Sequence, residues 1–591
     1  MDISERPVEL SHGQNLDRLL HAAMGRVTHG ISPASVSAAF MDWWAHLAIS
    51  PEKQQQLVGK ALRKWHRLVL YLLRTGAAGC CEKCLNWPCR CEPCIKPLPQ
   101  DSRFRHGDWQ QWPFNVIYQS FLLQQQWWHN VTTEVHGVTP HHEQVVTFVM
   151  RQLLDIWSPS NFAATNPEVI GESIRTGGRN LSQGAMNLWM DWERFAAGKR
   201  PEGTEGYQVG KNLAATPGKV VFRNRLIEMI QYAPHTDQVC PEPILIVPSW
   251  IMKYYILDLS PENSMVRYLV EQGHTVFTIS WKNPDEGDRD LGMEDYLRHG
   301  VMGALDAVST IVSKRKIHAV GYCLGGTLLS IVAAAMARDS DDRLASVSLL
   351  AAEVDFDEPG EISLFIDESQ VSYLEDIMWD QGYLDGKQMT GAFAMLNSKD
   401  LIWSKMIRDY LMGARQPVSD LMAWNADVTR LPYRMHSEYL RAFYLNNDLA
   451  EGRYRVAEKP IALADIRAPI FAVGTVRDHV APWRSVFKIH RLTDTDVTFV
   501  LTSGGHNAGI VSEPGHANRN FQVATHLHTE KNLDPETWQA TAPKQEGSWW
   551  TEWAKWLTAQ SAERIRPPQL GNVHAGYAPI CDAPGTYVLT P

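Results

Sequence analysis

The hexapeptide GYCLGG at residues 321–326 lies between the short β-branched run KIHAV and the apolar run TLLSIVAAAMA. This order predicts a strand, a turn with glycines on both sides, and a helix. Such a turn reverses the backbone sharply and presents one side chain at the end of the strand. Cys323 occupies that position, where the dipole of the following helix favours a thiolate. A buried cysteine in an ordinary βα turn is the alternative. The glycines on both sides favour a nucleophile.

Six short runs of apolar residues alternate with helical patterns from about residue 240 onwards. Strands that are buried on both faces and separated by helices indicate a largely parallel, doubly wound sheet. Residues 293–314 repeat apolar residues at helical spacing and predict a crossover helix. With the cysteine turn after the third run, the pattern predicts an α/β-hydrolase fold. The predicted strands are PILIVP (243–248), HTVFTISW (274–281), KIHAV (316–320), VSLLAAEV (347–354), PIFAVGT (469–475) and VTFVLTS (497–503).

Two stretches differ from this alternation. Residues 1–230 are rich in tryptophan and repeat apolar residues at helical spacing, so we expect a helical N-terminal domain ahead of a catalytic domain at 231–591. We interpret most of the tryptophans as core residues; a membrane or polymer surface is the alternative use. Residues 356–460 interrupt the strands with mostly helical sequence, which predicts a cap inserted over the C-terminal ends of the strands.

A cysteine nucleophile needs a base and an acid that orients the base, and in this fold they follow in the order nucleophile, acid, histidine. Asp478 lies just past the fifth predicted strand, and His506 lies just past the sixth. Both are therefore expected at the same edge of the sheet as Cys323. The chain has 22 histidines, and we select His506 because it directly follows a predicted strand. We interpret His479 as a residue next to the catalytic groups that supports them.

The same fold places two backbone N–H donors where an oxyanion develops. One is the residue after the nucleophile, which is Leu324. The other lies in the loop after the first predicted strand, at Ser249 or Trp250.

Composition excludes several classes of function. A net charge of −10 argues against a general nucleic-acid binder. The longest apolar runs fall short of the roughly 20 residues that span a bilayer, and the N-terminus lacks the basic and apolar regions of a signal peptide. Nine cysteines in 591 residues do not make a disulfide scaffold, so we expect a cytoplasmic protein.

Six of the cysteines lie together in CCEKCLNWPCRCEPC. Two C-x2-C pairs separated by a short linker could form a tetrahedral thiolate site for a structural zinc ion. A redox-sensitive loop and an incidental cysteine-rich segment are the alternatives. The cluster comprises Cys80, Cys81, Cys84, Cys89, Cys91 and Cys94.

Taken together, these residues resemble the polyhydroxyalkanoate synthases, also called poly(3-hydroxyalkanoate) polymerases, and most closely the class I single-subunit type. The resemblance extends from residue 101 to residue 557. Besides GYCLGGT, the blocks that carry it are SPSNFAATNPE (158–168), VGKNLAATPGKVVFRN (209–224), KYYILDLSPENSMVRYLVEQGHTVFTISWKNP (253–284), WNADVTRLP (424–432), RDHVAPW, GGHNAGI and GSWWTEWAKWL.

The resemblance implies an acyltransferase that polymerises (R)-3-hydroxyacyl-CoA, with 3-hydroxybutyryl-CoA as the expected substrate, and releases CoA. Cys323 would be the nucleophile, His506 its base, and Asp478 would help to activate the incoming hydroxyl. The resemblance also implies a homodimer on polyester granules in the cytoplasm, a growing polyester chain as product, and no cofactor for catalysis.

The sequence departs from the family pattern in the expected pocket. VPSWIMKYYI has Ser249 and Met252 where the family has proline and asparagine, and GGHNAGI has Asn507 where the family has isoleucine. LLAAEVDF replaces LLTTLLDF, although Asp355 is retained. These changes affect the expected monomer preference and turnover more than the expected reaction class.

Two other functions remain as alternatives. A cysteine hydrolase of the dienelactone-hydrolase type also has a G-Y-C-x-G-G turn, but such enzymes are much shorter and lack the blocks WNADVTRLP and GSWW. A catalytically inactive granule scaffold is disfavoured because the positions of Cys323, Asp478 and His506 are all filled.

Overall fold

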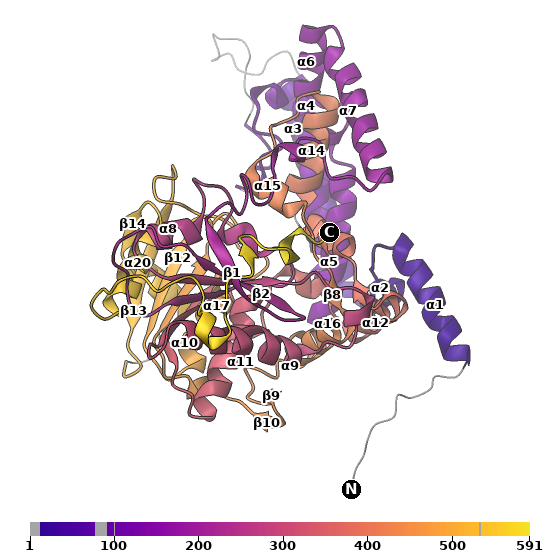
Figure 1. Ribbon diagram of the computed structural model, residues 1–591. Helices are drawn as coiled ribbons and strands as arrows, with labels where there is room; N and C mark the ends of the chain where they lie inside the picture. Colours follow the sequence, from indigo (N-terminus) through magenta and orange to yellow (C-terminus); the bar gives the residue numbers. More distant parts are fainter. Residues whose placement is uncertain (1–11, 77–91, 100, 397, 531–532) are drawn as a thin grey trace. The chain divides into compact units, whose positions relative to one another are not determined.

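The computed structural model describes residues 12–76, 92–99, 101–396, 398–530 and 533–591 (Figure 1). The chain forms two compact units, and both are discontinuous in sequence. The first unit comprises Met1–Ile31, Gly203–Gly391 and Val418–Pro591. The second comprises Ser32–Glu202 and Ala392–Pro417.

A mixed sheet of eleven strands is the centre of the first unit, in the order β14-β13-β12-β11-β6-β5-β3-β4-β2-β1-β15. Its middle six strands, from β12 to β4, are all parallel. Each of these six overlaps one of the six runs predicted from the sequence. Their bounds are β3 Ile244–Val247, β4 Val276–Trp281, β5 Ile317–Tyr322, β6 Leu344–Leu350, β11 Ile470–Thr475 and β12 Val497–Thr502.

Antiparallel strands extend the sheet at both sides. Two of them, β1 and β2, come from the end of the stretch that we expected to be helical, so the sheet begins before residue 231. The division into domains at residue 230 stays a prediction. The outer strands are β1 Gly218–Arg223, β2 Ile227–Tyr232, β13 Asn520–His526, β14 Lys544–Glu546 and β15 Cys581–Asp582.

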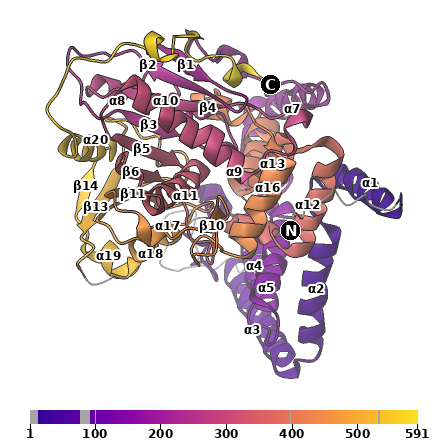
Figure 2. The same ribbon diagram turned by 60° about the horizontal axis from the view of Figure 1, so that its bottom comes forward.

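Helices cover both faces of the sheet (Figure 2). Successive residues of a strand point to opposite faces, and in β12 Val497 and Phe499 enter one core while Val500 enters the other. The first core includes α10 (Gly303–Ile311) and α11 (Leu324–Arg338), and the second includes α8 (Met265–Glu271) and α20 (Trp550–Ala559). This arrangement leaves the C-terminal ends of the parallel strands as the place for a site.

Two predicted elements differ in detail from the structure. The crossover helix is a short α9 (Met293–Asp295), a π-helical segment (Tyr296–Met302) and α10 in succession. The strand predicted at 347–354 is wrong in its second half, because β6 ends at Leu350 and Ala351 turns with a φ of 48°. The residues after that turn leave the sheet at its C-terminal edge.

The second unit is helical, as the spacing of apolar residues indicated. Its main helices are α2 Pro33–Ala48, α3 Pro51–Gly76, α4 Phe114–Thr132, α5 Pro140–Ile156, α6 Pro167–Thr176 and α7 Arg179–Ala196. By contrast, α1 (His12–Val27) belongs to the first unit, where it packs on α12 (Glu368–Gln381) and His21 Nδ1 lies 2.7 Å from Asp376 Oδ2.

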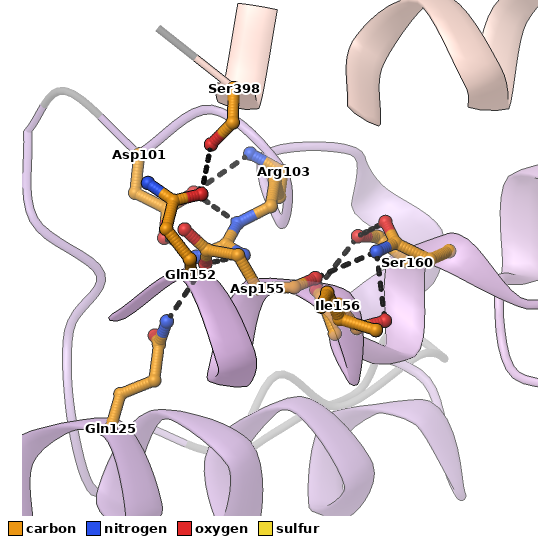
Figure 3. A network of polar contacts seen from close by, with 10 residues as sticks. Asp101, Arg103, Gln125, Gln152, Asp155, Ile156, Ser160 and Ser398 are labelled. Atoms are coloured by element: carbon orange, nitrogen blue, oxygen red, sulfur yellow. Dashed lines mark hydrogen bonds and ion pairs between the residues drawn. The ribbon is translucent and has the colours of Figure 1, made fainter. Parts of the chain in front are cut away.

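A buried polar network crosses the second unit (Figure 3). Arg103 donates to Asp155 Oδ1 at 2.7 Å and to both carboxylate oxygens of Asp101, at 2.9 Å and 2.8 Å. Gln125 donates to the same Asp155 oxygen at 3.2 Å. These bonds join the loop before α4 to α4 and α5.

The segment 392–417 is tied to the helices of the second unit. Ser398 donates to Gln152 Oε1 at 2.6 Å, as Figure 3 shows, and Asn180 donates to the carbonyl of Leu411 at 2.9 Å. Part of the stretch 356–460 that we predicted as a cap therefore packs with N-terminal helices. Its role as a cap stays a prediction.

The rest of that stretch lies in the first unit. It contains α12, the strand pair β7–β8 and the helices that follow. The bounds are β7 Tyr383–Leu384, α15 Asp420–Asn425, β8 Leu431–Pro432, α16 Tyr433–Tyr439, β9 Arg455–Val456 and β10 Lys459–Pro460. The helix α13 (Gly386–Leu396) begins in the first unit, and its residues from Ala392 onwards belong to the second. The remaining helices of the unit are α17 Trp483–Phe487, α18 Ile489–Leu492 and α19 Pro535–Thr541.

Within the described ranges, we find no helix that combines the length and the apolar composition needed to cross a bilayer.

Candidate active site

Cys323 lies in a strained turn between β5 and α11. Its φ of 51° and ψ of −125° are unusual for a residue with a side chain. Two backbone bonds hold the turn, because Cys323 N–H donates to Leu350 O at 2.9 Å and Gly326 N–H donates to Cys323 O at 2.8 Å. The sharp turn predicted from the sequence is therefore present, and Cys323 stands at the start of the helix.

The glycines around Cys323 permit close packing. A Cβ atom added to Gly325 would lie 2.1 Å from the carbonyl oxygen of Val247. A Cβ atom added to Gly321 would lie 2.3 Å from the Cα of Gly326. Only glycine fits at these positions, since the obstructing atoms belong to the backbone.

His506 and Asp478 meet at the same edge of the sheet. Nδ1 of His506 lies 2.8 Å from Oδ2 of Asp478, which also accepts from the hydroxyl of Thr475 at 3.1 Å. Oδ1 accepts the backbone N–H groups of Val480 and Ala481 at 2.9 Å and 2.8 Å. Four donors thus hold a carboxylate whose side chain is fully buried.

The charges of the three groups are coupled. Burial alone would lower the pKa of His506, but its electrostatic interactions with Asp478 and Cys323 raise it well above its ordinary value. Burial acts to raise the pKa of Asp478, whereas His506 and the two backbone donors hold it below its ordinary value. Since Nδ1 is engaged with Asp478, Nε2 is the ring atom that serves Cys323. The imidazole can therefore take the thiol proton while Asp478 stays ionised.

Tyr322 and Asn507 flank this arrangement. The hydroxyl of Tyr322 donates to Oδ1 of Asn507 at 2.6 Å, and its ring centroid lies 5.9 Å from that of His506. The bond joins the last residue of β5 to the residue after His506. Sequence reasoning identified Asn507 only as a departure from the family pattern and missed its partner.

The two predicted oxyanion donors follow neighbouring strands. Ser249 comes after β3 and Leu324 after β5, and these strands pair with Val247 opposite Gly321. Ser249 and Trp250 are buried, and the Ser249 hydroxyl accepts the N–H of Ile251 at 3.3 Å. Their role as oxyanion donors stays a prediction.

His479 is half-buried, and its backbone carbonyl accepts the N–H of Glu361 at 2.8 Å. Met252, another departure from the family pattern, forms an isolated bridge with Val428. Neither residue shares the bonds that join His506, Asp478 and Cys323.

Glu353 is a residue of this region that sequence reasoning placed inside a strand. It lies three residues past the end of β6, is 5% exposed, and its Oε1 has no hydrogen-bond partner. Its carboxyl group interacts electrostatically with Asp478 and Cys323. The signal that could have identified Glu353 is an acidic residue that interrupts the apolar run LLAAEV (349–354).

The cysteine cluster lies almost entirely outside the described residues, which include only Cys94 of the six. Cys94 is half-buried and forms no disulfide with another described cysteine. In the described ranges, no group of three or more His, Cys, Asp or Glu side chains is arranged to hold a metal ion. The zinc site stays a prediction.

Three family models match the chain. One described as "Poly-beta-hydroxybutyrate polymerase (PhaC) N-terminus" matches residues 100–269, and one described as "Poly-beta-hydroxybutyrate polymerase N terminal" matches residues 12–53. One described as "alpha/beta hydrolase fold" matches residues 242–512. With the parallel sheet, this last match confirms the predicted fold.

Several characterised proteins are similar to most of the chain. A poly(3-hydroxyalkanoate) polymerase of Methylorubrum extorquens is 41% identical over 503 residues, 84% of this chain and 82% of the relative. Subunits of such polymerases from Rhizobium meliloti (strain 1021) and Cupriavidus necator are each 37% identical, over 83% and 75% of this chain and 79% and 75% of their own lengths. Among solved structures, the monoacylglycerol lipase of Paleococcus ferrophilus is 11% identical, covers 57% of this chain and 99% of its own, and has a TM-score of 0.32.

Proposed function

Because this chain belongs to the poly(3-hydroxyalkanoate) polymerase family, we propose that it polymerises (R)-3-hydroxyacyl-CoA through an acyl-Cys323 intermediate and releases CoA. The observation that carries the proposal is the bond between His506 and Asp478 at the edge of the sheet where the Cys323 turn lies, together with the electrostatic interaction of His506 with Cys323. The expected substrate is 3-hydroxybutyryl-CoA, and the reaction class is acyl transfer.

The first half of the reaction loads the cysteine. His506 Nε2 takes the thiol proton, and the Cys323 thiolate attacks the thioester carbonyl of the substrate. Backbone N–H groups of Leu324 and of Ser249 or Trp250 stabilise the oxyanion. The carbon–sulfur bond to CoA then breaks, and CoA leaves with the proton that His506 holds. The acyl group remains a thioester, close in energy to the substrate.

The second half forms the polyester bond. The 3-hydroxyl of another unit loses its proton to His506, whose imidazolium form Asp478 stabilises, and its oxygen attacks the acyl-Cys323 carbonyl. The carbon–sulfur bond to Cys323 breaks, the thiolate recovers a proton from His506, and an oxygen ester remains. No step changes an oxidation state, so the sequence of transfers needs no redox cofactor.

Water would divert the acyl-enzyme to the free acid, so the site requires a cover. We assign that role to the insertion at 356–460, of which residues 356–391 and 418–460 lie in the same compact unit as Cys323. The family resemblance further supports a homodimer at the surface of polyester granules in the cytoplasm. Sedimentation of the protein with and without a preformed granule suspension tests both statements.

Incubation with (R)-3-hydroxybutyryl-CoA tests the reaction, with CoA release and the fate of the acyl group measured together. Insoluble polyester is the expected product, and Cys323→Ala is the matched control, expected to release no CoA above background. Stoichiometric free 3-hydroxybutyrate would instead identify a cysteine hydrolase. Equal, background release by both proteins would identify an inactive scaffold.

A further inference from the structure

Glu353 is held against the turn that carries Cys323. The hydroxyl of Thr327, in the first turn of α11, donates to the backbone carbonyl of Glu353 at 2.7 Å. The packing there is tight, since a Cβ atom added to Gly326 would lie 2.4 Å from the Cβ of Ala352. The backbone of Glu353 is therefore fixed against the first turn of α11, the helix that begins after Cys323.

The carboxyl group of Glu353 is buried without a hydrogen bond at Oε1. A buried polar atom without a partner destabilises the fold, and natural proteins contain few of them. Such an atom beside a nucleophile indicates a partner that arrives with the substrate.

The groups around Glu353 disfavour its ionised form. Burial raises its pKa far above the ordinary value, and the like charges of Asp478 and Cys323 act in the same direction. His506 and Lys488 act in the opposite direction and do not outweigh them.

Both of these cations already have anionic partners. His506 bonds to Asp478, and Lys488 Nζ lies 3.3 Å from both Asp355 Oδ1 and Glu358 Oε2. These surroundings favour the neutral form of Glu353, in which the carboxyl group donates one hydrogen bond and accepts others.

Aromatic residues form the other side of this region. Tyr439 and Tyr444 both interact electrostatically with Glu353 and with Cys323. Phe356 packs on both rings, with centroids 6.4 Å and 4.9 Å away. Trp250 lies edge-on to Tyr439 at 6.2 Å. The surroundings of the carboxyl group are thus largely aromatic.

An acyl group on Cys323 carries two kinds of oxygen. The carbonyl oxygen faces the backbone donors of the oxyanion hole, whereas the 3-hydroxyl, two carbons farther on, needs a partner of its own. A hydroxyl group and a neutral carboxyl group each donate and accept, so they are matched. On this chemistry, which rests on the proposed function, we propose that Glu353, at the position where the family pattern has leucine, binds the 3-hydroxyl of the acyl unit on Cys323 and increases the selectivity of this chain's site for hydroxylated acyl groups.

Single-turnover CoA release measures the acylation step alone and tests this proposal. The two substrates are (R)-3-hydroxybutyryl-CoA and butyryl-CoA, which lacks the hydroxyl. The wild-type protein is expected to favour the hydroxylated substrate in the second-order rate of acylation. Glu353→Leu, of similar size and without polar atoms, is expected to lose roughly 10- to 100-fold with (R)-3-hydroxybutyryl-CoA. Its rate with butyryl-CoA is expected to stay unchanged.

Glu353→Gln is the matched control, because its amide also donates and accepts. It is expected to keep the wild-type preference within about three-fold. Thermal unfolding of Glu353→Leu is expected to show no loss of stability, since the change removes an unpartnered buried group.

Three results would overturn the proposal: no preference in the wild-type protein, no effect of Glu353→Leu, or an equal loss with both substrates. An equal loss with both substrates would show that Glu353 affects the reactivity of the Cys323 thiol or the folding of the protein. Failure of the wild-type protein to release CoA from either substrate is a separate result, which would remove the proposed function and this inference with it.

Discussion

Nδ1 of His506 lies 2.8 Å from Oδ2 of Asp478, while the backbone N–H groups of Val480 and Ala481 hold the other oxygen of the carboxylate. The carboxylate cannot rotate without losing these bonds. The imidazole is therefore held in one orientation and one tautomer, with Nε2 available to Cys323.

Replacement of Asp478 by asparagine should remove both the charge and the preferred tautomer of His506. We expect CoA release from (R)-3-hydroxybutyryl-CoA to fall by on the order of 10²- to 10⁴-fold in Asp478→Asn. Asp582→Asn, which changes an exposed aspartate on β15, is the control and should match the wild-type rate. A rate for Asp478→Asn within ten-fold of wild type, about 1.4 kcal/mol, would contradict this role.

The stability of the protein should depend on the charge of His506. Its pKa is raised on folding above the ordinary value of 6.5. The stabilisation is therefore complete below about pH 6.5 and is lost as the pH rises through the raised pKa. The difference in free energy of unfolding between the wild type and His506→Gln should be larger at about pH 6 than at about pH 9. Urea denaturation at both pH values measures it, and parallel curves would refute the coupling.

The turn at Cys323 should not tolerate a side chain at Gly325. An added Cβ would meet the carbonyl oxygen of Val247 at 2.1 Å, so the backbone must shift. We expect Gly325→Ala to lower the free energy of unfolding by about 2–4 kcal/mol and to reduce CoA release. Gly171→Ala is the control, because Gly171 is exposed in α6 with no atom within 4 Å of an added Cβ. That change should stabilise the helix by up to about 1 kcal/mol, and equal effects would speak against steric restriction.

The bond between Tyr322 and Asn507 should show energetic coupling. Each single change, Tyr322→Phe or Asn507→Ala, leaves a polar atom at 2.6 Å without its partner. We expect a coupling free energy of about 1–2 kcal/mol from the double-mutant cycle, measured by urea denaturation. CoA release should fall in both single variants, because the loop that holds His506 loses an attachment to β5. Strictly additive effects would show that the bond does not contribute.

The network of the second unit should depend on Arg103, the cation that faces Asp155. Asp155 is 1% exposed, so Arg103→Ala leaves a buried carboxylate without its ion pair. We expect a loss of about 3–5 kcal/mol in the unfolding of this unit, followed by tryptophan fluorescence in urea. Arg175→Ala, which breaks a surface pair with Glu172, should change it by less than about 1 kcal/mol. Similar losses in the two variants would contradict the importance of burial.

The parallel strands could be predicted because their pattern is local. Each middle strand is a short apolar run, and burial on both faces requires such a run wherever it occurs. Cys323, Asp478 and His506 could be placed at one edge for a related reason, since parallel strands all end on the same side. The three residues also follow one another in the order nucleophile, acid, histidine, which is the order expected for this fold.

Other features depend on partners that are distant in the chain. The strands β1 and β2 pair antiparallel at the side of the sheet, and we included them in the helical stretch although a Pro-Gly break precedes the short run KVVF of β1. The segment 392–417 packs on α5 and α7 through bonds such as Ser398 to Gln152, across 246 positions of sequence.

By itself, the sequence determined the parallel core, the turn at Cys323 and the family, because each can be recognised from short stretches of contiguous residues. Only the tertiary structure decided what surrounds the nucleophile. From the sequence, Glu353 was predicted in the middle of an apolar strand. In the structure, β6 ends at Leu350, Ala351 forms a turn, and the backbone of Glu353 lies against the first turn of α11, which follows Cys323. Burial and the absence of a bond at Oε1 are properties of the folded surroundings, which contiguous residues do not encode.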